Sequence, residues 1–399
     1  AAVAEIEREA AAHGGAPAIV LVPDGLAALQ HAAAAWRGRF QPVVVGVTGS
    51  LAKTSTKEAI AETLAGRWTV LRNEGNENNE VGLPLTLLRL GPEHEVAVLE
   101  MGMYVPGEIA TLAALAHPTI GVVTAVRGTH LSRAGSIEAI ERGKGELVEA
   151  LPASGTAVLN ADDPRVAGMA ARTRARVVSY GFASAADVRA EAVTSLGTEG
   201  MRFRLVIGTD RMEATTPALG RHSVHNALCG AAVATALGMG LPQIVQGIRR
   251  GLRARHRTSL IRVGDWQILD DSYNAAPDSM AAALELLASL PGRRIAVLGP
   301  MLELGPSENE AHRAVGRQAA AAAEIVVTVG EGARGIAEGA WMAAGGSGSV
   351  HPAADRSEAL AILRRELRPA DVVLIKASRG AGLDWIVDEL VGAEGGSTS

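Results

Sequence analysis

The chain has 399 residues, 48% of them hydrophobic, so it is long enough for two or three domains with full-sized cores. Its net charge of −5 argues against a nucleic-acid or anionic-membrane surface, and its single cysteine excludes an internal disulfide and a multi-cysteine metal site. No apolar run reaches the about 18 residues of a membrane-spanning helix, and no secretion signal is visible, so we expect a cytoplasmic protein.

Residues 1–40 contain one or two alanine-rich helices around a short apolar run, too little for a separate domain. From residue 41 onward, short apolar runs alternate with helical stretches, which is typical of a parallel sheet covered by helices. An antiparallel addition and two further helices complete this region. We expect strands at 43–47, 96–99, 120–123, 156–159 and 177–180, the addition at 187–193, 202–207 and 211–216, and helices from 53, at 220–238 and at 242–251.

A basic stretch at 253–257 marks the expected boundary to a second α/β series. The small polar tail at 395–399 is expected to be disordered, and 345–348 is expected to be a flexible loop. No internal repeat is visible. The second series should contain strands at 266–269, 294–298, 325–329 and 372–375, and helices near 278–289, 309–323, 355–366 and 382–391.

The turn after the first strand, from Thr48 to Thr54, has the composition of a phosphate-binding loop. A strand that enters a glycine-rich turn and then a helix points several backbone N–H groups at one place. Lys53 would contact the β- and γ-phosphates, and Thr54 would ligate Mg²⁺. The strict pattern has glycine where this chain has Val47 and Ala52, and alanine costs about 1–2 kcal/mol where the backbone is left-handed. An ordinary strand–helix turn is the alternative.

Only four of the 38 basic residues are lysines. Because arginine cannot lose its proton or act as an amine nucleophile, a retained lysine is a candidate for work that needs a compact ammonium or a free amine. Arginine-biased codon usage is the alternative. The four are Lys53, Lys57, Lys144 and Lys376.

Polar residues also follow several of the expected strands. Glu100 ends an apolar strand and could ligate a cation, because open parallel sheets bind ligands at their strand ends. His130 follows the next strand, although a lone histidine is more often structural. Four of the eight asparagines lie within 73–82, where they suit either turns or a polar ligand. The segments 270–277 and 376–380 also follow strands, either as polar loops or as the second face of a cleft.

In this order, these segments resemble the Mur ligase family over about 15–392. The motifs at 100–103, 270–280, 301–305 and 376–380 are most similar to those of members that add D-alanyl-D-alanine. The resemblance implies an α/β fold with a central P-loop ATPase-like parallel-sheet domain, 41–252, and a smaller Rossmann-like C-terminal domain, 253–394. Residues 1–40 would be the remnant of an N-terminal domain and a linker.

The family joins a carboxylate to an amine with ATP, through an acyl phosphate. The resemblance therefore implies a peptide ligase of peptidoglycan precursor synthesis, which adds D-alanyl-D-alanine to a UDP-muramoyl tripeptide and needs one or two Mg²⁺ ions. It also implies a carbamylated lysine at Lys144, a modification that arginine cannot readily take. We expect a monomer without nucleic-acid or membrane partners.

The resemblance assigns roles to individual residues. Lys53, Lys144 and His130 would be catalytic. Metal ligands would be Thr54, Glu100, His130 and Lys144. ATP would contact Thr48, Gly49, Ser50, Lys53, Thr54, Ser55, Asn226, Arg257 and Asp271, whereas Asn78, Asn79, Asn274, Lys376, Ser378 and Arg379 would contact the nucleotide or the peptide substrate.

The sequence departs from the family pattern at several positions. The usual residues are asparagine and glycine at Leu51 and Ala52, asparagine at Ala125, Ser223 and Ala276, and aspartate at Pro300. Two alternatives therefore stay open: a related ligase that uses another amine or a polyglutamate acceptor, and a nucleotide-binding scaffold that has lost catalysis. Most of the UDP-sugar-binding domain is also missing, so the chain is either a fragment, which we favour, or a shortened member.

Overall fold

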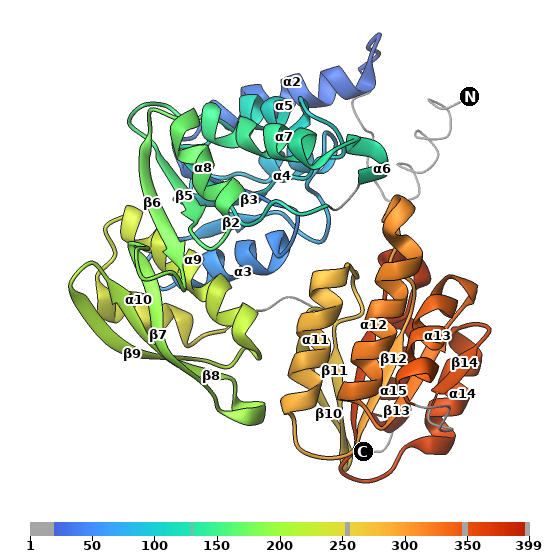
Figure 1. Ribbon diagram of the computed structural model, residues 1–399. Coiled ribbons are helices and arrows are strands. Elements are labelled where there is room, and N and C mark those ends of the chain that lie inside the picture. The colour runs from blue at the N-terminus through green and yellow to red at the C-terminus, as the bar shows by residue number, and fades with distance from the viewer. Residues whose placement is uncertain (1–19, 129–130, 252–255, 345–349, 396–399) are drawn as a thin grey trace.

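The computed structural model describes residues 20–128, 131–251, 256–344 and 350–395, which form two α/β lobes. Figure 1 shows the central lobe in blue to yellow and the C-terminal lobe in orange, each built on one sheet covered by helices. The expected α/β fold, with a larger parallel-sheet region followed by a smaller one, is confirmed. Within these described ranges, no helix is both long and apolar enough to cross a membrane.

The central lobe contains a nine-stranded sheet in the order β2-β3-β1-β4-β5-β6-β7-β8-β9. All pairs from β2 to β7 are parallel, and β8 and β9 extend the same sheet as antiparallel strands, as expected. The strands are β1 (Val43–Thr48), β2 (Val70–Arg72), β3 (Val96–Glu100), β4 (Ile120–Val123), β5 (Thr156–Asn160), β6 (Arg176–Gly181), β7 (Val188–Ser195), β8 (Met201–Ile207) and β9 (Asp210–Thr216).

Helices cover both faces of this sheet because its central strands are apolar on both sides. Val45 and Val47 of β1 point to the face covered by α3, α9 and α10, whereas Val44 points to the face covered by α2, α4, α5 and α7. The helices are α2 (Gly25–Arg37), α3 (Lys53–Leu64), α4 (Gly82–Leu88), α5 (Glu108–Ala116), α6 (Leu131–Ala134), α7 (Ile137–Glu149), α8 (Pro164–Gly168), α9 (Arg221–Ala236) and α10 (Leu241–Ile248).

Strand β1 pairs with β3 on one side and with β4 on the other, so the strand order reverses direction at β1. The carboxyl end of such a strand is where open α/β sheets bind ligands. Helix α3 starts there and is buried along most of its length between the sheet and α9. Gly230 permits this packing, because a β-carbon at that position would lie 2.8 Å from the hydroxyl of Thr63.

The C-terminal lobe contains a six-stranded sheet in the order β10-β11-β15-β12-β13-β14, in which only β10 pairs in the antiparallel direction. Helices α11, α12 and α13 pack on one face, and α14 and α15 pack on the other. The strands are β10 (Ser259–Val263), β11 (Trp266–Asp270), β12 (Arg294–Leu298), β13 (Ile325–Val329), β14 (Val350–Ala353) and β15 (Val372–Lys376). The helices are α11 (Pro277–Ser289), α12 (Glu308–Ala322), α13 (Arg334–Ala343), α14 (Arg356–Glu366) and α15 (Asp384–Gly395).

Short 3-10 helices complete the lobes: η1 (Met169–Arg172), η2 (Gly197–Glu199), η3 (Gly305–Ser307), η4 (Glu331–Ala333) and η5 (Arg379–Ala381).

The sequence missed three strands: β2, β10 and β14. Strand β2 has only three residues, and β14 contains a proline, so neither shows the alternating pattern of a strand. The expected loop at 345–348, positions 253–255 of the expected boundary stretch and most of the expected tail lie outside the described residues. Gly395, the first residue of the expected tail, is the last residue of α15. The proposed domain boundaries stay predictions.

Candidate active site

The carboxyl ends of the two sheets open into one cleft with a volume of about 550 Å³. The central lobe lines it with the turn between β1 and α3, with Glu100 and with the N-terminal half of α9. The C-terminal lobe lines it with the loops after β11, β12 and β15. The cleft therefore brings together segments that lie more than 300 residues apart in the sequence, such as Ser50 and Arg379.

The turn at the end of β1 is held by backbone contacts with the loop after β4. The N–H of Ser50 donates to the carbonyl of Ala125 at 2.7 Å, and the Ser50 hydroxyl donates to the carbonyl of Arg127 at 3.0 Å. Gly49 is required here, because a β-carbon would lie 1.8 Å from the hydroxyl oxygen of Thr124. These contacts hold the turn in place at the N-terminus of α3.

Ala52 immediately precedes α3 and has φ 59° and ψ 10°, which is the left-handed conformation. The sequence pattern requires glycine at this position for that reason, and the alanine costs about 1–2 kcal/mol. The chain thus keeps the backbone shape of a phosphate-binding turn without the residue that favours it. The departure changes the stability of the turn and leaves its geometry intact.

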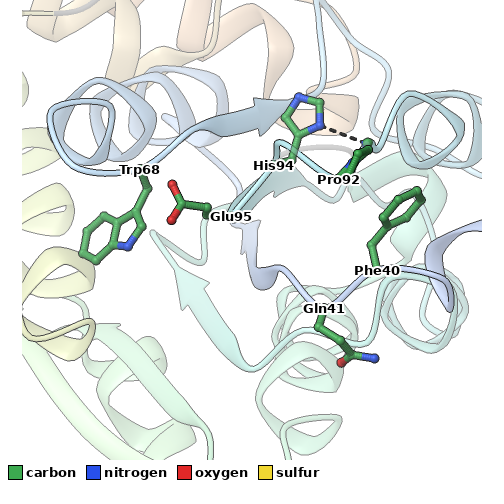
Figure 2. A pocket seen from close by; sticks show the side chains of 7 residues that line it. Phe40, Gln41, Trp68, Pro92, His94 and Glu95 are labelled. Atoms are coloured by element: carbon green, nitrogen blue, oxygen red, sulfur yellow. Dashed lines mark hydrogen bonds between the residues drawn. The ribbon is translucent and has the colours of Figure 1, made fainter.

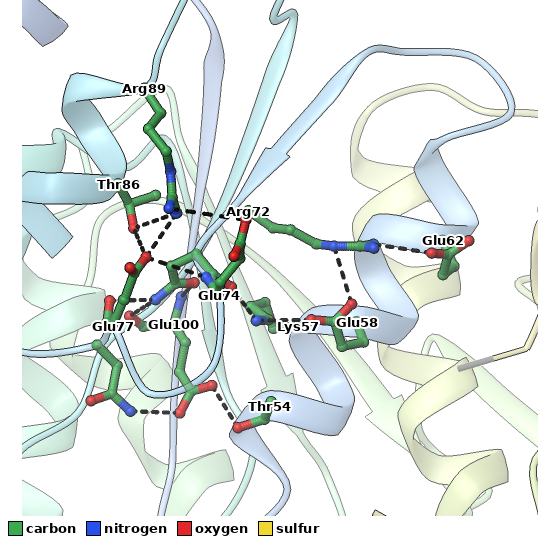
Figure 3. A network of polar contacts seen from close by, with 12 residues as sticks. Thr54, Lys57, Glu58, Glu62, Arg72, Glu74, Glu77, Thr86, Arg89 and Glu100 are labelled. Atoms are coloured by element: carbon green, nitrogen blue, oxygen red, sulfur yellow. Dashed lines mark hydrogen bonds and ion pairs between the residues drawn. The ribbon is translucent and has the colours of Figure 1, made fainter. Parts of the chain in front are cut away.

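Glu100 lies at the end of β3, and its carboxylate is held between two donors. The Thr54 hydroxyl donates to one oxygen at 2.7 Å, and the Asn78 amide donates to the other at 2.8 Å (Figure 3). The side chain of Glu100 is buried. A carboxylate next to a hydroxyl, facing an open cleft, is an oxygen ligand set of the kind that Mg²⁺ prefers, so these residues fit the ion.

Two lysines on this side of the cleft have lowered pKa values. Burial lowers the pKa of Lys53, an effect that Glu100 partly offsets and Arg257 adds to. Burial lowers the pKa of Lys144 well below its usual range, and the charge of Lys53 lowers it further. Only 4% of Lys144 is exposed. Lys53 and Lys144 therefore lie within electrostatic range of each other beside the phosphate-binding turn.

On the opposite wall, Asp271 and Lys376 form an ion pair with 2.5 Å between Oδ2 and Nζ. The other carboxylate oxygen of Asp271 accepts a hydrogen bond from the N–H of Thr258 at 3.0 Å. Nearby, the guanidinium carbons of Arg257 and Arg379 lie 4.1 and 5.3 Å from the ring centroid of Tyr273. This wall therefore presents two guanidinium groups to the cleft.

A second cavity of about 550 Å³ continues from the cleft past Ala52 and α9. Asn226 lies at the junction of the two cavities, and its side-chain oxygen accepts a hydrogen bond from the Thr56 hydroxyl at 3.0 Å. Beside it, burial lowers the pKa of His222, an effect that the negative charge of Asp271 partly offsets. The second cavity is suited to a planar group because Phe182 and His225 contribute rings to its lining.

Most of the predicted site residues line the cleft, but four do not, and His130 lies outside the described residues. Thr48 is buried and donates to the carbonyl of Met101 at 2.9 Å, and Gly49 lies beneath the turn. Asn79 instead accepts hydrogen bonds from the backbone at the start of α4. Lys144 is buried beside the turn. The lining residues are Ser50, Lys53, Thr54, Ser55, Asn78, Glu100, Asn226, Arg257, Asp271, Asn274, Lys376, Ser378 and Arg379.

Sequence reasoning did not assign a role to two side chains that the cleft includes, His222 and Tyr273. His222 lies in the expected helix at 220–238 and Tyr273 in the polar segment 270–277, but their contacts depend on how the lobes meet. An ionic contact also joins the lobes. Arg127, after β4, lies 2.5 Å from Asp163 in its own lobe and 3.3 Å from Asp278 at the start of α11.

Figure 2 shows a different hollow, of about 530 Å³, at the other end of the central sheet. It is lined by residues that precede β1 and β3, including Phe40, His94 and Glu95. His94 accepts a hydrogen bond from the N–H of Gly91, and Glu95 accepts one from the N–H of Thr69. Because this hollow lies at the amino ends of the strands, its polar groups stabilise the loops, and we do not assign it to the active site.

Comparisons with known proteins match both lobes. The Mur ligase middle domain matches residues 47–234, and a domain described as "Mur ligase, glutamate ligase domain" matches residues 256–379. A UDP-N-acetylmuramoyl-tripeptide–D-alanyl-D-alanine ligase from Mycobacterium tuberculosis is 41% identical over 94% of this chain and 78% of its own length.

Two solved structures have the same fold. MurF from Acinetobacter baumannii superposes with a TM-score of 0.85 at 30% identity, covering 94% of this chain and 82% of its own. MurF ligase from Thermotoga maritima, in complex with ADP, superposes with a TM-score of 0.85 at 25% identity, covering 99% and 92%.

Proposed function

The chain belongs to the Mur ligase family, and from this premise we propose that it is the ATP-dependent ligase that adds D-alanyl-D-alanine to UDP-N-acetylmuramoyl-tripeptide in peptidoglycan precursor synthesis. The observation that carries the proposal is the cleft itself. It combines a phosphate-binding turn with the Thr54–Glu100 pair on one wall and with two arginines on the other, in a chain whose relatives carry this activity in their names.

The reaction proceeds in two steps. The carboxylate of the tripeptide attacks the γ-phosphorus of ATP, and ADP leaves, which gives an acyl phosphate. The amine of D-alanyl-D-alanine then attacks the acyl carbon, loses a proton, and expels inorganic phosphate as the amide forms. Because neither step needs a protein nucleophile, the protein contributes orientation and charge stabilisation.

The central wall binds the phosphates and stabilises their charge. The ammonium of Lys53 stabilises the negative charge that moves from the γ-phosphate to the leaving ADP, together with the backbone N–H groups of the turn. Thr54 and Glu100 would hold Mg²⁺, which neutralises phosphate charge when it is bound. Asn78 keeps the Glu100 carboxylate aimed at the cleft through its 2.8 Å hydrogen bond.

Lys144 is proposed to carry a carbamate. Burial lowers the pKa of Lys144 well below its usual range, which raises the fraction of neutral amine, and only a neutral amine can attack CO₂. Its nitrogen bonds to the carbon of CO₂ and releases one proton to solvent, so the neutral amine becomes an anionic oxygen ligand. An arginine at this position could not do this, which agrees with the retention of a lysine in an arginine-rich chain.

The C-terminal wall is proposed to bind the nucleotide from the other side and to orient the substrates. Arg257 approaches the phosphates, and Arg379 reaches toward the peptide. Asn226 and the second cavity would take the adenine. Asn274 and Ser378 stay proposed substrate contacts. A cytoplasmic location and a monomeric state remain predictions from the sequence.

The proposal is tested by measuring phosphate release with each substrate omitted in turn. The expected result is release of ADP and phosphate only when ATP, the UDP-muramoyl tripeptide and D-alanyl-D-alanine are all present, with loss of this activity in Lys53→Ala and Lys144→Arg. Stimulation by another amine alone would favour a related ligase. Tight ATP binding in calorimetry without turnover would favour a nucleotide-binding scaffold.

A further inference from the structure

Lys57 is a buried lysine that the proposed mechanism does not use. It lies on α3, one helical turn after Lys53, and only 1% of it is exposed. Its Nζ donates a hydrogen bond to the backbone carbonyl of Asn73 and lies 2.8 Å from Oε1 of Glu58 (Figure 3). A lysine is rarely buried this fully unless its charge is paired, and here one carboxylate and one carbonyl satisfy it.

Asn73 connects Lys57 to the active site. It follows β2, and its side-chain amide clamps the backbone of Glu100 from both sides. The Asn73 side-chain oxygen accepts from the Glu100 N–H at 2.9 Å, and its side-chain nitrogen donates to the Glu100 carbonyl at 3.0 Å. The same nitrogen donates to the carbonyl of Glu77 at 2.8 Å, next to Asn78. Only 1% of Asn73 is exposed.

Asn73 thus fixes the two parts of the protein that position the Glu100 carboxylate, the Glu100 backbone and the loop before Asn78. It holds the Glu100 backbone at the end of β3, and it holds the loop whose next residue, Asn78, donates to the carboxylate. From the other side, Thr54 of α3 donates to the same carboxylate. Helix α3 therefore contacts Glu100 directly through its first turn and, through Lys57 and Asn73, indirectly from its second turn.

We propose that Lys57 is a positioning residue that, through Asn73, holds the carboxylate of Glu100 in the orientation needed to bind the divalent cation. The inference rests on the proposed function, because that function makes Glu100 a metal ligand. Partners that orient a metal ligand in this way are typically worth 10- to 100-fold in metal affinity or activity.

The shape of the site explains why a lysine was kept here. The compact ammonium of Lys57 contacts a carbonyl and a carboxylate inside a nearly closed space, where the larger planar guanidinium of arginine would displace Asn73. The two cationic side chains, Lys57 and Arg72, are matched by two carboxylates, those of Glu58 and Glu62. The guanidinium of Arg72 lies 3.2 Å from Glu58 and 3.0 Å from Glu62 (Figure 3).

This arrangement offers a matched pair of variants. Lys57→Met removes the ammonium but keeps the length and the apolar stem of the side chain. Arg72→Met removes a charge from the same chain of ion pairs, at a guanidinium whose ion pairs are with Glu58 and Glu62 and not with the side chain of Asn73. If Lys57 only stabilises the fold, both variants should lower the melting temperature and reduce the active fraction, and neither should change the requirement for the cation.

The experiment measures two quantities in each variant: the Mg²⁺ concentration at half-maximal phosphate release, and the affinity for Mn²⁺ in the presence of ADP, by calorimetry. Lys57→Met should weaken both by about 10-fold, and Arg72→Met should leave both unchanged. Lys57→Arg should not restore the wild-type values. Asn73→Ala should give the same shift as Lys57→Met, without addition in the double variant, and it serves as the test if Lys57→Met does not fold.

Glu100→Gln distinguishes the metal-ligand role of Glu100 from the positioning role of Lys57. Loss of cation affinity in Glu100→Gln together with wild-type affinity in Lys57→Met and Asn73→Ala would overturn the positioning role and leave the proposed function standing. Wild-type cation affinity in Glu100→Gln would overturn the metal-ligand role of Glu100 and, with it, this inference.

Discussion

The lysines at the cleft differ in whether the protein itself pairs their ammonium groups. On the C-terminal wall, Lys376 is paired: it lies 2.5 Å from the carboxylate of Asp271 and donates to the carbonyl of Asn274 at 2.8 Å. In the central lobe, Lys53 lines the cleft and Lys144 is buried beside the phosphate-binding turn. The structure gives these two lysines no hydrogen bond or ion pair among the residues that it describes, and burial lowers the pKa of both.

Pairing within the protein therefore distinguishes lysines that hold the site in shape from lysines whose ammonium group is available to a ligand. A paired buried lysine stabilises the folded state and holds its partner in one orientation, as Lys376 holds Asp271. An unpaired buried lysine costs stability, and folded proteins retain such groups where a ligand or a modification satisfies them. Here the triphosphate would satisfy Lys53, and a carbamate would remove the charge of Lys144. Two stability measurements test this comparison, and a third tests the backbone strain at Ala52, which immediately precedes Lys53.

The largest expected effect is on Lys376→Met. This variant leaves the Asp271 carboxylate without its partner in a buried site, and breaking one side of a buried pair typically costs about 3–5 kcal/mol. Urea denaturation of the variant and the wild type should show this loss in the free energy of unfolding. An unchanged free energy would mean that the pair is not formed, and the contrast between the walls would disappear.

Lys144→Met should have the opposite sign near neutral pH, because it removes an amine that the folded chain can hold only by releasing its proton or by burying an unpaired charge. The unfolded chain holds the Lys144 proton up to a pKa near 10.5, whereas the folded chain releases it at lower pH. Between these two values, the stability of the wild type should therefore rise with pH by up to about 1.4 kcal/mol per unit relative to the variant. Denaturation at several pH values in CO₂-depleted buffer measures this difference, and a flat difference would count against the unpaired amine.

The smallest expected effect is on Ala52→Gly. Glycine removes the strain of a left-handed alanine, about 1–2 kcal/mol, but it also loses more backbone entropy on folding, about 0.5–1 kcal/mol. A net stabilisation of about 0.5–1 kcal/mol should appear in thermal denaturation. Gly238→Ala provides a control at another left-handed position, φ 73°, where alanine should destabilise. A less stable Ala52→Gly variant would show that the turn gains nothing from glycine.

The sequence predicted the parts of the site that depend on local order along the chain. A strand that ends in a polar residue places that residue at the carboxyl edge, which is how the sequence indicates Glu100 and Asp271. Lys53 is indicated by the glycine-rich turn between a strand and a helix. The left-handed backbone of Ala52 followed from the missing glycine. These predictions need only the periodicity of a strand and the direction of a parallel sheet.

The remainder depends on contacts between distant segments, which the sequence pattern does not contain. Asn79 was expected at the substrate, but it closes the turn before α4, because its side chain points at backbone N–H groups two and three residues ahead. The pairing of Lys376 with Asp271 depends on the alignment of β15 with β11. Lys57 stood out as a rare lysine, but its role became visible only when Asn73 and Glu100 were placed beside it.

The central claim is that the cleft transfers the γ-phosphate of ATP to the carboxylate of the tripeptide. The most direct measurement uses UDP-muramoyl tripeptide labelled with ¹⁸O in the reacting carboxylate, followed by mass spectrometry of the products. The account predicts that one ¹⁸O atom appears in the inorganic phosphate for each amide bond formed, because phosphate leaves with the oxygen that attacked it. Unlabelled phosphate, or ¹⁸O in AMP, would contradict it.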